Sequence, residues 1–138
     1  MSDTDTASNA ARQLITSYNR AFMARDLATL RSIYVEDAGG QFSYFDNHAG
    51  CDASSLDEHL QQLETFFASG EPIGGLDIEH LHPHLAGSPP EQTLVITARV
   101  RYRQHTERPT VRMTVVATQV HARWRICHMH FSDMPATL

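Results

Sequence analysis

The chain has 138 residues, a length that fits one domain with its own hydrophobic core, so we expect a single domain over residues 1–138. Its formal net charge of −5 argues against nucleic acid and anionic membranes as partners, because both attract basic proteins. No apolar run reaches the length of a membrane span, and the start of the sequence lacks the features of a secretory signal, so we expect a cytoplasmic protein. Cys51 and Cys127 form no motif, which argues against a disulfide framework.

The first two helices are predicted before residue 40. Helix one is expected to follow a flexible polar tail over residues 1–8, with Ser8 or Asn9 as its N-cap. Asp26 is the expected N-cap of a shorter second helix, and Gly39–Gly40 is its expected end. Their apolar positions recur at helical spacing and are Leu14, Ile15, Tyr18 and Phe22 in the first helix, and Leu27, Leu30, Ile33 and Tyr34 in the second.

A third helix is predicted after a short strand over residues 41–45. Ser55 and Glu58 form a capping-box pattern at its start, and Gly70 marks its end. Its apolar stripe consists of Leu56, His59, Leu60, Leu63, Phe66 and Phe67.

After the third helix the apolar period changes to two, which predicts strands. Short connections between these strands favour an antiparallel meander. Three helices followed by a long, curved antiparallel sheet give an α+β fold. The four predicted strands cover residues 76–85, 92–105, 110–121 and 124–131.

The last strand carries large residues on both faces. Such a strand lies between two packed layers, which here indicates helices on one side and another subunit on the other. A strict period of two places Trp124, Ile126, His128 and His130 on one face, and Arg125, Cys127, Met129 and Phe131 on the other.

Two groups of histidines alternate along strands at spacings that zinc, copper or nickel ligands use. They are His80, His82 and His84, and His128 and His130. The sequence has no Cys-x-x-Cys pair and no helical pair of histidines with an intervening glutamate, so we expect no metal. We interpret these histidines as part of a subunit interface that loosens as the pH falls toward the ordinary histidine pKa.

The order of elements, the Arg25-Asp26-Leu27 break between the first two helices and the ending from Trp124 to Ser132 resemble the nuclear transport factor 2-like (SnoaL-like) superfamily. The resemblance implies a cone-shaped fold, in which the curved sheet wraps around the helices and leaves a pocket inside. It also implies a dimer through the outer face of the sheet. The superfamily includes isomerases, dehydratases, cyclases and non-enzymatic binding modules, so the fold alone does not fix a function.

Within this superfamily the chain looks most like the association domain of calcium/calmodulin-dependent protein kinase II and its stand-alone bacterial relatives. The similar segments are residues 59–64, residues 82–87, Arg99 and residues 124–130. The resemblance implies that His59 and Arg99 line the pocket and hold a carboxylate. Two further pocket arginines of that pattern are unmatched: one position holds Phe131, and a valine near 115 or 116 holds the other. Arg112, on the same strand as these valines, is a partial substitute.

A comparison with ketosteroid isomerases, which share this fold, argues against their mechanism. Tyr18 stands where their oxyanion-hole tyrosine would lie, but their catalytic carboxylate would fall at about Phe42. A phenyl ring cannot take a proton from a carbon next to a carbonyl group.

Two site residues have alternatives that the sequence leaves open. Arg99 belongs either to a solvated polar face, with Thr97 and Arg101, or to the pocket, where it offers a planar fork to a ligand carboxylate. His59 is either a satisfied core residue or a group that acts on a ligand.

We therefore expect a homodimer or a larger ring that binds a small aromatic or carboxylate-bearing molecule in its cone without a cofactor. The alternative is a cofactor-free lyase or isomerase, of ketosteroid-isomerase or polyketide-cyclase type, that acts in the same pocket. Whether the protein is an enzyme is left open. The expected ligand-binding residues are Tyr18, Tyr44, His59, Arg99 and Arg112.

Overall fold

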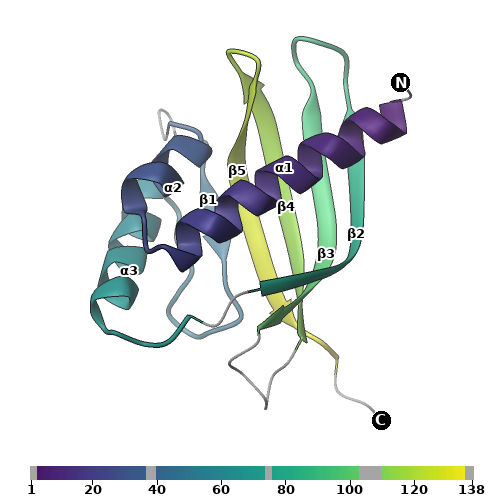
Figure 1. Cartoon of the computed structure of the whole chain (residues 1–138). Coiled ribbons are helices and arrows are strands. Elements are labelled where there is room, and N and C mark those ends of the chain that lie inside the picture. The colour runs from purple at the N-terminus through teal and green to yellow at the C-terminus, as the bar shows by residue number, and fades with distance from the viewer. Residues whose placement is uncertain (1–2, 37–39, 74–75, 103–109, 136–138) are drawn as a thin grey trace.

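The computed structural model describes residues 3–36, 40–73, 76–102 and 110–135, which form three helices and five strands (Figure 1). This α+β architecture confirms the predicted fold class. The expected strand residues 103–105 lie outside the described ranges. The elements are α1 (Asp3–Met23), α2 (Leu27–Ile33), β1 (Ser43–Phe45), α3 (Leu56–Ala68), β2 (Leu76–Ala86), β3 (Thr93–Tyr102), β4 (Thr110–Val120) and β5 (Arg123–Asp133).

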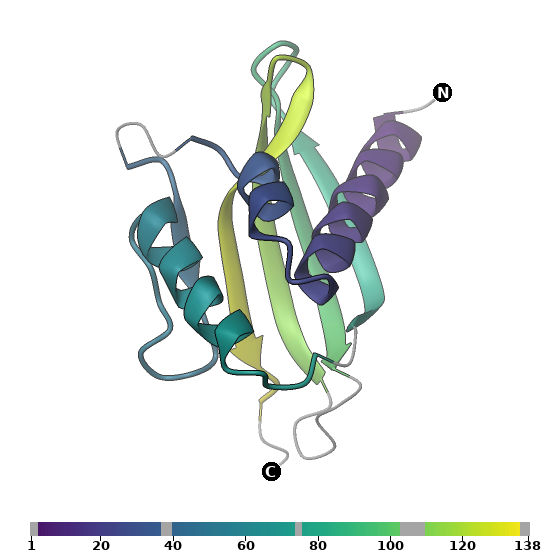
Figure 2. The same cartoon turned by 60° about the vertical axis from the view of Figure 1, so that its left-hand side comes forward.

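The strands form one curved sheet in the order β1-β5-β4-β3-β2. Neighbours from β2 to β5 are antiparallel, as the short connections predicted, whereas β1 pairs with β5 in parallel. All three helices lie on one side of this sheet: α1 crosses it diagonally, and α2 and α3 lie toward the β1 edge (Figures 1 and 2). The sheet therefore has an inner face toward the helices and an outer face away from them.

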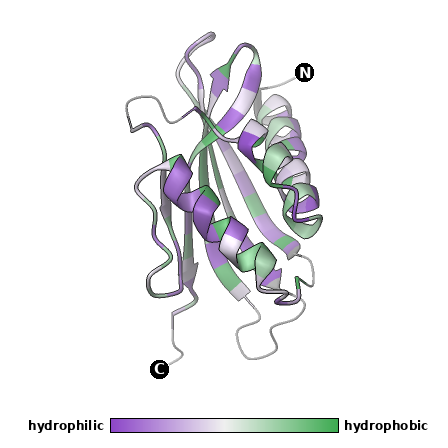
Figure 3. Ribbon diagram, turned by 90° about the vertical axis from the view of Figure 1, so that its left-hand side faces the viewer, coloured by the Kyte–Doolittle hydropathy of each residue, from purple (hydrophilic) through white to green (hydrophobic). Residues whose placement is uncertain are grey.

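Alternating hydropathy assigns each strand residue to one of these faces, as the banded colouring of the strands illustrates (Figure 3). On β3 the apolar residues Ile96, Ala98 and Val100 are buried, while Thr97 and Arg99 between them are exposed. Neighbouring residues of a strand point to opposite faces, so the first three belong to the inner face and the other two to the outer face. The core consequently fills the space between the inner face and the helices.

Helix α1 begins earlier than the sequence predicted. Its first residue is Asp3, so the expectation of a flexible tail over residues 1–8 is wrong for residues 3–8, and neither Ser8 nor Asn9 is an N-cap. The physical reason is burial: Ala7 and Ala11 continue the apolar side of the helix and are covered in the core. Alanine also has the highest intrinsic preference for a helix.

Helix α2 begins as predicted but ends earlier. Asp26 caps it, because its Oδ1 accepts a hydrogen bond of 3.1 Å from the backbone N–H of Thr29. The expected end at Gly39–Gly40 is wrong, since the helix stops at Ile33. The chain then turns extended, and the backbone N–H of Val35 donates to the carbonyl oxygen of Ile126 on β5. Pairing with the sheet replaces the last helical turns.

Helix α3 follows its capping pattern. The Ser55 hydroxyl accepts a hydrogen bond of 3.2 Å from the backbone N–H of Glu58. The far end of the helix is held by Arg25, whose guanidinium donates to the carbonyl oxygens of Phe67 and Glu71. Among the described residues, no helix is long and apolar enough to cross a membrane. The buried residues of α3 are Leu56, His59, Leu60 and Leu63.

Strand β5 departs from a strict period of two. Val116 of β4 pairs with His128, but the next residue, Ala117, pairs with Ile126, so Cys127 is an extra residue in β5. This β-bulge places Ile126 on the inner face together with the buried Met129 and Phe131. The prediction that Ile126 shares a face with His128 and His130 is therefore wrong.

Candidate functional site

Four rings fill the inside of the cone near the β1 edge, and we refer to them as the aromatic cluster: Tyr34, Phe42, Tyr44 and His59. The His59 ring lies at the centre. Its centroid is 5.4 Å from those of both Tyr34 and Phe42 and 4.2 Å from that of Tyr44, which stacks on it. The sequence stretches that supply these rings are the end of α2, the segment before β1, β1 itself and α3.

His59 carries the chemistry of the cluster. Its side chain points inward because it belongs to the apolar stripe of α3, and only 2% of the residue is exposed. Nε2 lies 3.1 Å from the Tyr34 hydroxyl, a hydrogen bond, whereas Nδ1 has no hydrogen-bond partner among the described residues. A buried polar atom without a partner is uncommon and destabilising, which marks this atom as a candidate contact for a ligand.

Burial lowers the pKa of His59 to about 4, so the imidazole is neutral at neutral pH. Burial also raises the pKa of Tyr34 and of Tyr18, the buried α1 tyrosine. The hydrogen bond between these two hydroxyls adds to the rise in the pKa of Tyr18 and opposes the rise in the pKa of Tyr34.

The Tyr34 hydroxyl and His59 Nε2 share one hydrogen bond, and the tautomer of the neutral imidazole decides which of the two donates. The Tyr34 hydroxyl also donates to Met129 Sδ at 3.9 Å. Nδ1 is a donor in one tautomer and an acceptor in the other. The relay Tyr18–Tyr34–His59 therefore ends in an unused polar ring nitrogen inside the cone.

Tyr44 connects the cluster to a carboxylate. Its ring covers His59 and also lies near Phe131, at 5.9 Å between centroids, while its hydroxyl donates to Asp46 Oδ1 at 3.2 Å. The Asp46 side chain is 14% exposed, and its Oδ2 lies 3.0 Å from Nδ1 of His48. Tyr44 is only partly buried, so its ring lies between the buried His59 and the solvent.

Three of the five predicted site residues come together here: Tyr18, Tyr44 and His59. Sequence reasoning missed Tyr34 and Asp46. In the sequence pattern Tyr34 was one more apolar position of the second helix, and no spacing rule distinguishes it from the other apolar residues of that helix. Asp46 directly follows β1, and an acidic residue at the end of a strand next to a predicted pocket residue is the signal that was available.

The structure places the two predicted arginines elsewhere. Arg99 and Arg112 are Cα partners on β3 and β4 and lie on the outer face, so the prediction that they face into the cone is wrong. The physical reason is the pleat: turning Arg99 inward would turn Ile96, Ala98 and Val100 outward. The cone thus contains tyrosine hydroxyls and a neutral imidazole in place of a cationic carboxylate holder.

The predicted histidine groups also lie on the outer side of the sheet. His128 Nδ1 is 2.8 Å from the Ser43 hydroxyl, and Phe45 contacts the rings of both His128 and His130. Burial lowers the pKa of His128. In the part of the chain that the structure describes, no three His, Cys, Asp or Glu side chains converge as a metal site would require.

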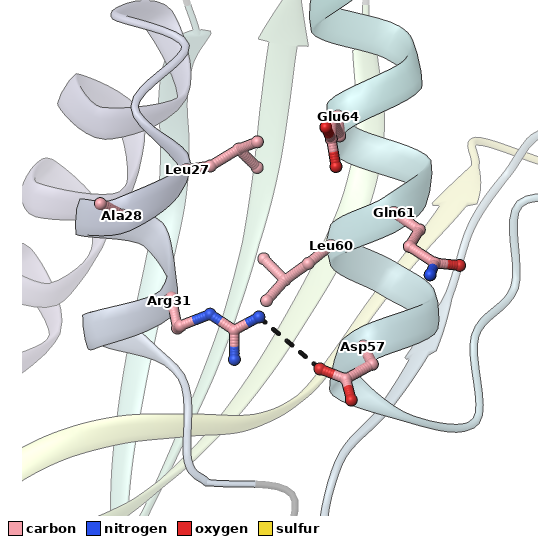
Figure 4. Close-up of a pocket in the computed structure, with 7 residues that line it drawn as sticks. All are labelled: Leu27, Ala28, Arg31, Asp57, Leu60, Gln61 and Glu64. Carbon is pink, nitrogen blue, oxygen red and sulfur yellow. Dashed lines mark ion pairs between the residues drawn. The ribbon is translucent and has the colours of Figure 1, made fainter.

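A cavity of about 390 Å³ lies between α2 and α3 (Figure 4). Leu27 and Leu60 project toward each other inside it, and an ion pair of 3.6 Å joins Arg31 to Asp57 at one end (Figure 4). Because Leu60 follows His59 on α3, this cavity flanks the helix that carries His59. The full lining is Leu27, Ala28, Arg31, Asp57, Leu60, Gln61 and Glu64.

The family model for the SnoaL-like domain matches residues 11–137. The chain belongs to this family. The match covers α2, α3, the sheet, the part of α1 from residue 11 onward and every residue of the aromatic cluster, and it confirms the SnoaL-like (NTF2-like) resemblance proposed from the sequence. No curated protein matches the chain.

Solved structures confirm the cone fold of the SnoaL-like chain. An NTF2-like protein of unknown function from Shewanella oneidensis has a TM-score of 0.70 at 19% identity, over 91% of this chain and 98% of its own. A candidate scytalone dehydratase from Novosphingobium aromaticivorans has a TM-score of 0.68 at 16% identity, over 98% and 89% of the two chains. A candidate calcium/calmodulin-dependent protein kinase type II association domain from Thiobacillus denitrificans has a TM-score of 0.60 at 14% identity, over 88% and 93%. At these identities the likeness establishes the fold alone.

The depressed pKa of His59 predicts that acid destabilises the protein. The unfolded chain binds a proton at the ordinary histidine pKa of 6.5, whereas folded His59 binds it only near pH 4. Stability from this group is therefore complete above pH 6.5 and falls between pH 6.5 and 4. From about pH 7.5 to about pH 5, His59 should lower the free energy of unfolding by about 2 kcal/mol.

Urea denaturation of the wild type and His59→Gln at both pH values measures this effect. Glutamine keeps a polar partner for Tyr34 but does not titrate, so the loss attributed to His59 should be absent from the variant. Other groups, including His128, contribute equally to both proteins and cancel in the difference. An equal loss in the two proteins would show that His59 is not buried in the neutral form.

Proposed function

We propose that the protein binds a small, neutral, partly aromatic molecule inside the cone, with His59 Nδ1 as the polar contact. One observation carries this proposal: a buried ring nitrogen that has no hydrogen-bond partner among the described residues and is surrounded by aromatic rings. Ligand pockets of this kind are mostly apolar and contain a few fixed polar groups. A ligand hydroxyl group suits Nδ1 in either tautomer because it both donates and accepts, and a carbonyl oxygen suits the tautomer that carries the hydrogen on Nδ1.

The aromatic cluster also limits the ligand class. The sequence favoured an aromatic or a carboxylate-bearing ligand, and the cone supports the first of these. The polar side chains around His59 are the neutral Tyr18 and Tyr34, and the nearby Asp46 would repel an anion. A ligand reaches His59 when the partly exposed Tyr44 ring swings away, since His59 is otherwise covered.

Thermal unfolding against a panel of small compounds tests the binding proposal. Aromatic ketones and phenols should raise the melting temperature, because a ligand that binds only the folded state stabilises it by mass action. His59→Leu should remove the stabilisation. Arg99→Gln should retain it, because Arg99 lies on the outer face. Hits confined to carboxylates and lost in Arg99→Gln would contradict the proposal.

A second candidate function is cofactor-free dehydration, a lyase reaction, at the same site. Asp46 supplies a carboxylate at the far end of Tyr44 from His59. In this reaction Asp46 takes the proton from the carbon next to the carbonyl group and passes it to the departing hydroxyl group, while His59 Nδ1 holds the substrate by a hydrogen bond. Water leaves and a carbon–carbon double bond forms. One structural neighbour is named a candidate scytalone dehydratase, which makes this reaction class worth testing.

Incubation with β-hydroxy aromatic ketones tests dehydration, because the conjugated product absorbs in the near ultraviolet. We expect turnover in the wild type, a loss of turnover in His59→Leu, and a loss of about 100-fold or more in Asp46→Asn, since a positioned acid–base group contributes about that much. Asp52→Asn is the matched control: Asp52 is an exposed carboxylate whose Oδ1 accepts from the backbone N–H of Asp46. Binding of these ketones without turnover would be consistent with the ligand-binding function and would exclude the enzymatic one.

We also propose that the outer face of the sheet joins two copies of the chain. Val95 and Val116 form a cross-strand apolar pair near the middle of this face, and His128 continues the same row on β5. An apolar centre with polar groups around it is typical of protein interfaces. Phe45 on β1 adds a large apolar side chain that is 46% exposed.

Sedimentation velocity of Val116→Lys tests this interface. A buried lysine without a partner is costly, so the variant should sediment as a monomer where the wild type sediments as a dimer or larger ring. Met23→Lys is the control, since Met23 is 49% exposed on α1, on the helical side of the molecule. Unchanged sedimentation of Val116→Lys would exclude the outer face as the interface.

A further inference from the structure

A groove of about 360 Å³ crosses β2, β3 and β4 on the outer face, separate from the cone. Arg99 and Arg112 form one part of it, and His80, His82 and the hydroxyl-bearing Thr97 form another. None of the lining residues is acidic, although the whole chain carries a net charge of −5. The lining is His80, His82, Thr97, Ala98, Arg99, Arg112, Met113 and Thr114.

The two arginines stand directly opposite each other. Arg99 and Arg112 are Cα partners in the β3–β4 ladder, so their side chains leave the same face of the sheet from adjacent strands. Like charges in this arrangement repel and destabilise the sheet. The arrangement becomes favourable when an anion lies between the two guanidinium groups.

The carboxylate opposite Arg99 forms its ion pair with another arginine. Glu79 is the Cα partner of Arg99, but its Oε1 lies 3.4 Å from the guanidinium of Arg101. Asp77 is the Cα partner of Arg101, two pairs further along the ladder. Among the described residues, neither Arg99 nor Arg112 forms an ion pair. Both guanidinium groups are thus available to a ligand.

Strand β2 is distorted where it meets the groove. Its register with β3 shifts between Glu79 and His82, and His80 adopts a positive φ of 51°. Non-glycine residues seldom take such a φ, and β-bulges commonly redirect side chains at functional sites. Here the distortion supplies both His80 and His82 to the lining opposite the arginines.

We propose that this groove binds a phosphate group. Two planar guanidinium forks suit a tetrahedral oxyanion, because each can donate two parallel hydrogen bonds to its oxygens. The Thr97 and Thr114 hydroxyls and the histidine N–H groups are further donors around the same space. The volume also accommodates part of the molecule that carries the phosphate.

The phosphate site and the proposed subunit interface adjoin on the outer face. Arg99 lies four residues from Val95 along β3, which corresponds to about 13 Å. Thr97 and Thr114, however, line the groove and form the next outer-face pair after Val95 and Val116. The oligomeric state of each variant is therefore measured together with its phosphate binding. The site is independent of the cone, since the sheet itself lies between Arg99 and His59.

Isothermal titration calorimetry with inorganic phosphate, in sodium chloride buffers of matched ionic strength, tests the site on the full chain. Saturable binding to the wild type is expected, with affinity at least about tenfold weaker in Arg99→Gln and in Arg112→Gln, since each removes charge-assisted hydrogen bonds. Arg12→Gln, which alters an exposed arginine of α1, should bind like the wild type. Heat that matches the sodium chloride control, or equal binding in all four proteins, would overturn the proposal.

Two further measurements test the phosphate assignment. Phenyl phosphate should bind at least as well as inorganic phosphate if the groove also holds the carrier molecule, whereas binding of succinate but not phosphate would overturn the assignment. Without phosphate, Arg112→Gln should melt no lower than the wild type, because it removes the repulsion. This readout shows that the variant is folded, so that its loss of binding cannot be assigned to unfolding.

Discussion

One extra residue in β5 sets the arrangement on which both faces of the sheet depend. Strand β5 pairs with β4 on one side and with β1 on the other, and the segment after α2 also pairs with it. Without the bulge at Cys127, Ile126 and Met129 could not both present their apolar side chains inward. With it, Ile126 and Met129 enter the core, while His128 faces outward beside Ser43. The cone and the outer face are consequences of the same irregularity.

Inside the cone the protein carries a polar relay in an apolar shell. Such a relay stabilises a structure only when every member has a partner, and Nδ1 of His59 has none among the described residues. An apolar residue of similar size would avoid the cost that acid imposes on a buried histidine. The histidine is therefore more easily understood as a group kept for a ligand than as packing material.

Much of the fold could be predicted from local patterns, because those patterns are themselves the physical causes. Asp26 and Ser55 cap helices through bonds to residues three positions on, and the apolar stripe of α3 indicated that His59 is buried. The end of α2 could not be predicted, since it depends on pairing with β5, far along the chain. Arg99 is instructive in another way. Its own strand pattern favoured the outer face, and only the family resemblance placed it in the cone.

The position of Arg99 also explains why a family pocket pattern transfers poorly to this chain. In a strand, moving a cation from one face to the other requires the whole row of apolar partners to move with it. Retaining Arg99 and Arg112 on the outer side therefore excludes them from the cone and leaves the cone electrically neutral apart from Asp46 at its edge. If both binding proposals hold, the neutral interior selects ligands by ring shape and by one polar contact, whereas the cationic outer groove selects them by charge. The single sheet would then separate two surfaces with opposite chemical preferences.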